Sequence, residues 1–222
     1  EWEYLDQISK CERIVANTDS CYQGYLALSL LFKVASNLER RKTHIQEALK
    51  INNTINRIWR EYAETNYQLG NMSIALQQFQ EAIRIDTKDA ISFEGIGLCY
   101  YYLDEPFKAL NPLKKALTFQ PENHIIMNHL SFILSEIGEV DEAHDLILQA
   151  LELKPNNNIY LDTYACILFL QDKHEQSLKV FERILENKPK EWEVSWDILF
   201  NVYDTLGLHV KAKQIEEKMQ IK

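Results

Sequence analysis

Residues 93–102, FEGIGLCYYY, bring together the side chains that could carry chemistry: the thiol of Cys99 and the phenols of Tyr100, Tyr101 and Tyr102. A thiolate can act as a nucleophile or bind a metal, and a phenol can donate a hydrogen bond to a ligand. Two glycines precede them inside what otherwise reads as a helix. The stretch is therefore a reactive site, an aromatic binding surface or a packed helix, and its surroundings must decide between these.

The other cysteines do not form a metal or redox motif with Cys99. No pair of cysteines lies in a Cys-x-x-Cys spacing. We therefore expect free thiols in a reducing, intracellular compartment, by default the cytoplasm. A disulfide between Cys11 and Cys21 is the alternative, supported only by their proximity in the sequence.

Familiar catalytic and metal-binding motifs are also missing from the sequence. It contains no Gly-rich phosphate loop, no H-E-x-x-H and no G-x-S-x-G. His124 and His129 are five residues apart, which is the wrong phase for two metal ligands on one helix face. We therefore expect no enzymatic activity, no metal site and no cofactor.

Composition and charge indicate an acidic, all-helical protein. The 222 residues include only six Gly and five Pro, so few residues would interrupt helices. The net charge is −9, and residues 1–60 carry +2 while the remainder carries −11. Nucleic-acid binding needs clustered Lys and Arg, so an RNA-binding helical repeat is disfavoured. No apolar stretch is long enough to predict insertion into a membrane.

A period of 34 residues organises most of the chain. Large residues recur at Trp59, Phe93, Met127 and Leu161. Four positions later come the small residues Ala63, Gly97, Ser131 and Ala165. A second stripe begins at Ala75, Ala109, Ala143 and Ser177 and continues at Phe79, Leu113, Ile147 and Phe181. Such stripes predict two helices per block, and the small residues would let helix backbones approach closely.

Turn and stop signals separate these predicted helices. Between the two helices of a block lie Leu69-Gly70, Leu103-Asp104, Ile137-Gly138 and Gln171-Asp172. Gly adopts the left-handed conformation that ends many helices, and Asp tolerates it better than most residues. Pro121, Pro155 and Pro189 close three blocks, because proline cannot continue a helix.

This pattern closely resembles the tetratricopeptide repeat family. The resemblance implies an all-α fold, an α-solenoid with a right-handed superhelix of stacked antiparallel helix pairs. We expect one array over residues 1–222, with a leading helix over 1–21 that is either a separate helix or half of a truncated repeat. Six repeats would follow at 22–55, 56–89, 90–123, 124–157, 158–191 and 193–222. One residue inserted near Glu191 restores the register, and the last repeat would act as a cap.

In the resembled family, the first helices of successive repeats line a concave groove that binds partners. The groove positions are the second, fifth, ninth and twelfth of each block, which together form one helix face. From them we select a partner-binding groove made of Arg57, Arg60, Glu64, Tyr67, Glu94, Leu98, Tyr101, Asn128, Phe132, Asp162 and Phe169. Some family members grip an acidic C-terminus with a set of Lys, Asn and Arg residues at these positions. That set is absent here, since the corresponding sites hold Arg60 and Glu64, Glu94 and Leu98, or Asn128 and Phe132.

The resemblance implies a non-enzymatic scaffold that binds a protein or peptide partner, and an amphipathic segment is one form that such a partner takes. The apolar line through Leu98, Tyr101, Phe132 and Phe169 motivates this hypothesis, since exposed apolar patches commonly bind partners. The N-terminal helix or a flanking domain filling the groove is the alternative at this surface. An interaction or sensor segment of a larger enzyme or signalling protein is the alternative function, because the chain begins with Glu1 rather than Met.

Overall fold

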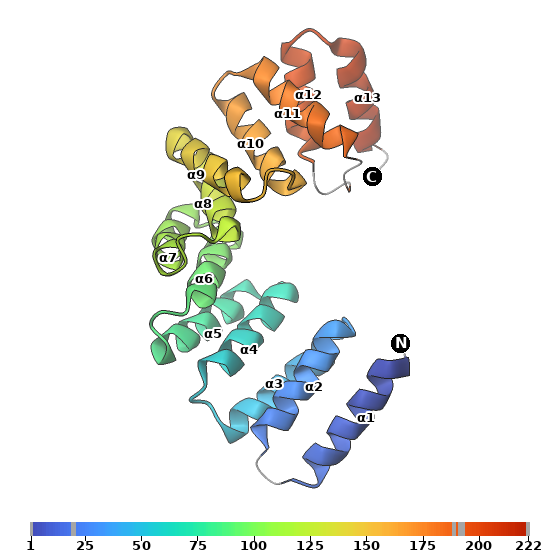
Figure 1. Ribbon diagram of the computed structural model, residues 1–222, viewed down its shortest axis with the longest axis vertical. Helices are drawn as coiled ribbons and strands as arrows, with labels where there is room; N and C mark the ends of the chain where they lie inside the picture. Colours follow the sequence, from blue (N-terminus) through green and yellow to red (C-terminus); the bar gives the residue numbers. More distant parts are fainter. Residues whose placement is uncertain (1, 19–20, 188–189, 191–193, 221–222) are drawn as a thin grey trace. The chain divides into compact units, whose positions relative to one another are not determined.

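A computed structural model describes residues 2–18, 21–187, 190 and 194–220. Within these ranges the regular secondary structure is entirely α-helical. Thirteen helices follow one another in this part of the chain, and all but the first form antiparallel pairs (Figure 1). None of the described helices has both the length and the apolar character needed to cross a bilayer. The expected all-α solenoid of helix pairs is therefore confirmed.

A single helix comes first and six pairs follow it. The leading helix α1 spans Trp2–Ala16. The first helices of the pairs are α2 Tyr22–Val34, α4 Asn56–Gln68, α6 Ala90–Tyr102, α8 His124–Glu136, α10 Asn158–Leu170 and α12 Trp196–Thr205. The second helices are α3 Leu38–Ile51, α5 Met72–Ile85, α7 Pro106–Phe119, α9 Val140–Leu153, α11 His174–Glu186 and α13 His209–Gln220.

Left-handed turn residues separate the two helices of every pair. The residues with positive φ are Ser36, Gly70, Asp104, Gly138, Asp172 and Gly207. The predicted turns at residues 70, 104, 138 and 172 are confirmed. At Gly70 and Gly138, φ is 80° and 88°, a region that is costly for a residue with a Cβ atom.

Side-chain caps begin several of the first helices. Asp89 accepts a hydrogen bond from the backbone N–H of Ser92, at the start of α6. Asn123 and Asn157 accept backbone N–H bonds in the same way at α8 and α10. Such caps satisfy N–H groups that have no partner within the helix. Pro121 and Pro155 follow the ends of α7 and α9 as predicted, whereas Pro189 and Glu191 lie outside the described residues.

Small residues bring the two helices of a pair into close contact. Ala75, Ala109, Ala143 and Ser177 have no exposed surface. The Ser177 hydroxyl donates to the carbonyl of Ala165 at 2.8 Å, directly across the pair. A Cβ atom at Gly97 would lie 2.6 Å from Leu113 Cγ, so this position has no room for a side chain. The predicted close approach of a neighbouring helix at Gly97 is confirmed.

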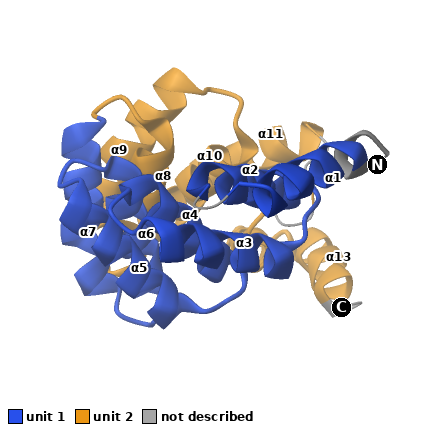
Figure 2. Ribbon diagram, turned by 90° about the horizontal axis from the view of Figure 1, so that it is seen from below, with its two compact units in different colours: residues 1–120 blue, residues 121–222 orange. Residues whose placement is uncertain are grey.

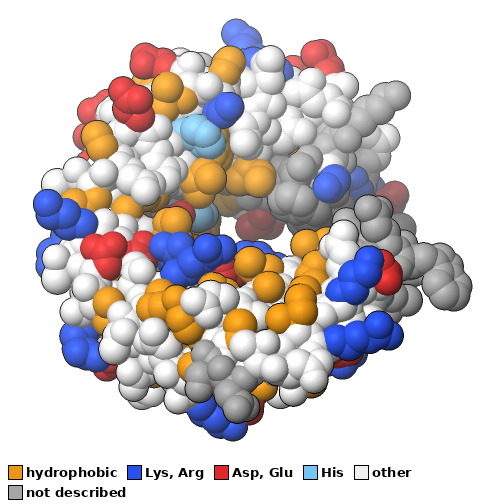
Figure 3. All heavy atoms as spheres, turned by 60° about the horizontal axis from the view of Figure 1, so that its bottom comes forward, with side chains coloured by type: hydrophobic (Ala, Val, Ile, Leu, Met, Phe, Trp, Pro, Cys, Tyr) orange, Lys and Arg blue, Asp and Glu red, His pale blue; other side chains and the backbone are white. Residues whose placement is uncertain are grey.

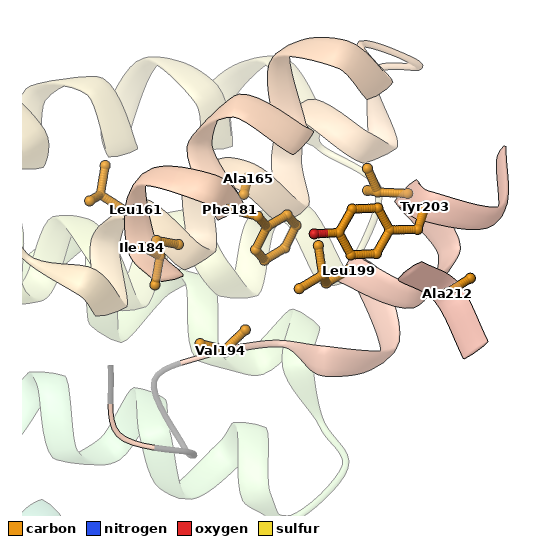
Figure 4. Packing of buried hydrophobic residues seen from close by; sticks show 9 residues of the cluster. Leu161, Ala165, Phe181, Ile184, Val194, Leu199, Tyr203 and Ala212 are labelled. Atoms are coloured by element: carbon orange, nitrogen blue, oxygen red, sulfur yellow. The ribbon is translucent and has the colours of Figure 1, made fainter. Parts of the chain in front are cut away.

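The chain divides into two compact units, residues 1–120 and 121–222 (Figure 2). Within each unit, every helix packs against the next one in the sequence. Several hydrophobic clusters join neighbouring helices. One cluster of unit 2 joins α10, α11, α12 and α13 through Leu161, Phe181, Leu199, Tyr203 and Ala212 (Figure 4).

The ends of the chain bear on the expected repeats. In the leading helix α1, Ile8 is buried against Leu28 and Phe32 of α2, whereas Ile14 is 55% exposed. Residue 193, the expected start of the last repeat, lies outside the described residues. Because α12 begins only at Trp196, Val194 precedes the helix and packs into the core, although its repeat position belongs to the groove.

Candidate functional site

A pocket of about 270 Å³ lies among helices α4, α5 and α6 of unit 1. Four residues selected for the groove line it: Glu64 and Tyr67 of α4, and Glu94 and Leu98 of α6. The remaining lining residues are Gln68, Phe79, Ile91 and Gly95. We call this feature the α4–α6 pocket.

The aromatic ring of Phe79 lies directly against Gly95. A Cβ atom at Gly95 would lie only 2.4 Å from Phe79 Cζ, so the ring fills the space that a side chain would need. Phe79 itself is 3% exposed and belongs to the core cluster with Ala63 and Ile96. The absence of a side chain at Gly95 therefore gives the pocket an aromatic wall.

Tyrosines extend the aromatic surface from Tyr67. The ring of Tyr67 meets that of Tyr102 edge to face at 5.7 Å, and Tyr101 meets Tyr102 in the same way at 5.4 Å. Burial, followed by the neighbouring Tyr102, raises the pKa of Tyr67 well above its usual value. Tyr67 therefore presents a neutral hydroxyl. Tyr101 is half-buried and does not line the pocket.

A buried arginine supports the α4 side of the pocket. Arg41 of α3 has no exposed surface, and its Nη2 atom donates to Glu61 Oε2 at 2.6 Å and to Glu64 Oε2 at 3.4 Å. Its Nη1 atom donates to Gln68 Oε1 at 3.0 Å. Lys33 Nζ also donates to Glu64 Oε2, at 3.0 Å. The preceding helix pair thus holds two side chains that line the pocket.

A second ion pair joins α4 to α6. Arg60 Nη1 lies 3.1 Å from Asp89 Oδ1, and Asn56 Nδ2 donates to Asp89 Oδ2 at 3.2 Å. Asp89 caps α6, so Arg60 helps to fix the start of that helix against α4. Arg60 therefore has an internal partner, while Arg57, also selected for the groove, is exposed.

In unit 2, two of the residues selected for the groove serve internal contacts. Asp162 accepts hydrogen bonds from the backbone N–H of Ser195 at 2.7 Å and from its hydroxyl at 2.6 Å. Burial raises the pKa of the Asp162 carboxyl. Phe169 packs against the core cluster of this unit, with its ring 5.1 Å from that of His174.

The other two residues of unit 2 lie on α8 and differ in exposure. Phe132 is 37% exposed, whereas Asn128 is 6% exposed. Among the described residues, the buried Asn128 Oδ1 atom has no hydrogen-bond partner. Neither residue lines the α4–α6 pocket.

Cys99 is a packing residue. Its side chain is fully buried between Ala63 and Ile96, and burial raises its pKa to about 12. A thiol with so high a pKa is a poor nucleophile near neutral pH. Within the described part of the chain, no three His, Cys, Asp or Glu side chains are grouped to hold a metal ion.

Charged side chains of both signs lie on the surface. On the face in Figure 3, hydrophobic side chains lie beside both basic and acidic ones.

Comparison with solved structures places the fold. A tetratricopeptide repeat protein from Parabacteroides merdae aligns with a TM-score of 0.76 at 17% identity, covering 92% of this chain and 80% of the other. The chain has the tetratricopeptide repeat (TPR) fold. Pseudomonas aeruginosa PilF aligns with a TM-score of 0.74 at 16% identity, covering 91% of each chain. YrrB, described as a TPR protein with an unusual peptide-binding site, aligns with a TM-score of 0.66 at 16% identity, covering 82% of this chain and 94% of its own.

Sequence comparison finds a partial match to a human protein. No family model matches the chain. Human protein O-mannosyl-transferase TMTC1 is 23% identical over 150 residues, which cover 68% of this chain. The match spans only 16% of the length of that relative.

The TPR pattern did not identify every residue that lines the pocket. Gln68 follows the twelfth position of its block, Phe79 was assigned to helix packing, and Gly95 does not stand at a groove position. The one signal for Arg41 is that it occupies the position where the next four blocks have Ala or Ser.

Proposed function

We propose that this chain is a non-enzymatic TPR scaffold that binds a segment of a partner protein, and that the α4–α6 pocket receives one apolar side chain of that segment. The observation that carries the proposal is the convergence of Leu98, Ile91 and Phe79 on one concave site beside polar side chains. An apolar centre with a polar margin is the usual composition of a peptide-binding hot spot.

The size of the pocket favours a side chain over a cofactor. Small-molecule sites usually enclose about 300–1,000 Å³, and this pocket measures about 270 Å³. A pocket at or below the lower limit suits one anchoring residue of a longer ligand. YrrB, whose description includes a peptide-binding site, provides a precedent for peptide binding on this fold.

The charge of the chain bears on the kind of partner. Two carboxylates, those of Glu64 and Glu94, line the pocket, and no Lys or Arg does. Together with the net charge of −9, this favours a neutral or basic segment over an acidic one. An amphipathic segment would direct its apolar side toward Leu98 and Ile91.

A second candidate function is an interaction segment of a larger enzyme whose chemistry lies elsewhere in the polypeptide. The match to part of a protein named as an O-mannosyl-transferase favours this candidate. Immunoblotting of the endogenous polypeptide tests it, since a mass far above 26.1 kDa would support a larger protein. A band at 26.1 kDa would argue against it.

Selection of a displayed random-peptide library on the chain tests the proposed scaffold function. We expect selected peptides to bind at least tenfold more weakly to Leu98→Ala, because that change removes apolar contact area inside the pocket. Leu148→Ala, on the exposed face of α9, is the matched control and should leave affinity unchanged. Isothermal titration calorimetry measures both. Equal affinity for wild type and Leu98→Ala would reject the pocket as the binding site.

A further inference from the structure

The amide of Gln68 is held in one orientation by Arg41. A guanidinium group has only hydrogen-bond donors, so the Gln68 atom that faces Arg41 Nη1 at 3.0 Å must be the oxygen Oε1. The amide nitrogen Nε2 then points away from Arg41. Among the described residues Nε2 makes no hydrogen bond, and the Gln68 side chain is exposed and lines the pocket. The pocket therefore has a fixed N–H donor on its wall.

Glu64 supplies an acceptor beside this donor. Its Oε2 atom receives the hydrogen bonds from Lys33 and Arg41, at 3.0 and 3.4 Å. Its Oε1 atom accepts none within the described part of the chain, and Glu64 also lines the pocket. Glu64 and Gln68 are four residues apart on α4, so their side chains share one helix face.

A residue of an extended peptide carries the complementary pair. Its N–H and C=O point to the same edge of the strand, and its side chain stands roughly perpendicular to that edge. We propose that the α4–α6 pocket recognises the main chain of one extended residue: the residue's N–H donates to Glu64 Oε1, its C=O accepts from Gln68 Nε2, and its apolar side chain enters the pocket. This inference rests on the proposed peptide-binding function and names the group that is recognised.

The ion pairs around Glu64 argue against a simple cation site. Lys33 and Arg41 already approach the one carboxylate oxygen from two sides, so much of its charge is compensated. The remaining oxygen is better suited to a neutral N–H donor. Arg41 has no exposed surface and cannot touch the peptide, so it acts as a positioning residue for Gln68 and Glu64.

Model compounds test main-chain recognition directly. The probe is N-acetyl-leucine N-methylamide, titrated into the ¹⁵N-labelled chain while the backbone amide signals of Gly95 and Leu98 are followed by NMR. Its partner compound replaces the leucine N–H by an ester oxygen, which removes the donor for Glu64. We expect the ester to bind about tenfold more weakly, the usual effect of losing one hydrogen bond.

A charge-matched pair of variants tests the donor on the wall. Gln68→Glu keeps an acceptor for Arg41, so the fold should be retained, but it removes the N–H donors. The amide probe should bind Gln68→Glu about tenfold more weakly. Gln80→Glu, on the exposed surface of α5, adds the same charge outside the pocket and should leave the affinity unchanged.

Arg41→Lys tests the positioning role. Lysine retains a cation for Glu61 but lacks the second arm that reaches Gln68. In an Arg41→Lys variant shown to be folded by its circular dichroism, the ratio of amide-probe dissociation constants with Gln68→Glu and with Gln68 should fall from about ten toward one. A residue with only a structural role would leave that ratio unchanged.

The outcomes separate this inference from the proposed function. Equal binding of the amide and the ester, with signal shifts at Gly95 and Leu98, would overturn main-chain recognition and leave the apolar pocket standing. Isovaleramide, which carries a primary amide and an apolar branch, should bind more weakly than the probe; equal affinity would reassign the site to side-chain amides and also overturn the inference. If no compound shifts the signals of Gly95 or Leu98, both main-chain recognition and the proposed function of the pocket would be overturned.

Discussion

Arg41 stands at a repeat position that Ala75, Ala109 and Ala143 occupy in later pairs, and all three alanines are buried. A guanidinium at such a position needs polar partners, because burying a charge without them is costly. Glu61 and Gln68 provide those partners from the next helix pair. One substitution in the repeat pattern thus adds polar contacts between α3 and α4 to the apolar packing of Ile45 and Ala48 against Ile58.

Replacing Arg41 by the alanine of the other pairs should destabilise the chain. Arg41→Ala leaves Glu61, which is 7% exposed, without its 2.6 Å partner. Loss of one member of a buried ion pair costs about 3–5 kcal/mol, so we expect a loss of about 3 kcal/mol in the free energy of unfolding. Urea denaturation measures this value. The double variant Arg41→Ala/Glu61→Met should recover much of the loss, and a double variant less stable than the single would contradict this account.

We expect His44 to make the stability of unit 1 depend on pH. Its ring stacks on Phe32 at 5.2 Å, and its Nδ1 atom is buried without a hydrogen bond among the described residues. Burial, followed by the nearby Arg40, lowers the pKa of His44 below its usual 6.5, while the carboxylates of Glu12 and Glu47 act in the opposite direction. The unfolded chain therefore binds a proton more readily than the folded chain does just below pH 6.5.

The sign of the effect follows from this difference. The free energy of unfolding should fall as the pH decreases from about 7 through 6.5 toward the folded pKa, and it should be independent of His44 above that range. Urea midpoints at pH 7.5 and 5.5 measure the fall. In His44→Phe the fall should be smaller, and a fall equal to that of wild type would assign the effect to other groups.

At the scale of the helix, local backbone chemistry made the elements predictable. The first helices begin at Tyr22, Asn56, Ala90, His124 and Asn158, 34 residues apart. The turn residues with positive φ keep the same interval from Ser36 to Asp172. Helix starts and turns depend on residues that are neighbours in the sequence, so the repeat pattern alone predicts their positions. At the C-terminal end the register depends on an insertion, and there α12 begins later than the pattern predicted.

Gly138 provides a test of the turn chemistry at this scale. Its φ is 88°, and a Cβ atom built there would have nothing within 4 Å, so the cost of substitution lies in the backbone alone. Gly138→Ala should lower the free energy of unfolding by about 1–2 kcal/mol. Gly138→Asn should cost less, because Asn enters the left-handed region more readily. Urea denaturation of the two variants measures the order, and an alanine variant as stable as wild type would disprove the assignment.

The candidate site was only partly predictable because its polar contacts join different helices. The spacing of residues along the helices predicted that Glu64, Tyr67, Glu94 and Leu98 share one surface, and these four do line the pocket. The same phase also selected Arg60, although its guanidinium is paired with Asp89. Spacing along one helix indicates which way a side chain points.

Spacing does not reveal what the side chain meets on the next helix. The same is true of Asp162. Its hydrogen-bond partner Ser195 lies 33 residues further along the chain, so spacing along one helix did not predict this contact. Arg41 was a departure from the repeat pattern with no partner evident in the sequence. Its contacts with Glu61 and Gln68 appear only once α3 and α4 are packed together.

At the scale of the whole molecule, the chain comprises two compact units that share one kind of helix pair. Residues selected for a single groove are divided between them, with Tyr101 in the first unit and Phe132 in the second. A groove running through both units therefore stays a prediction, and the α4–α6 pocket is a site of the first unit alone.

All the side chains that line the pocket fall between Glu64 and Leu98, and the arginine that orients two of them is at position 41. The surface proposed to bind the partner is thus encoded by a short continuous stretch of about two helix pairs. Because solenoid repeats interact only with their neighbours, such a stretch can be moved to another array as one unit. It could be duplicated in evolution or grafted into another array with its binding preference intact, provided that the donor sequence includes the helix that carries Arg41.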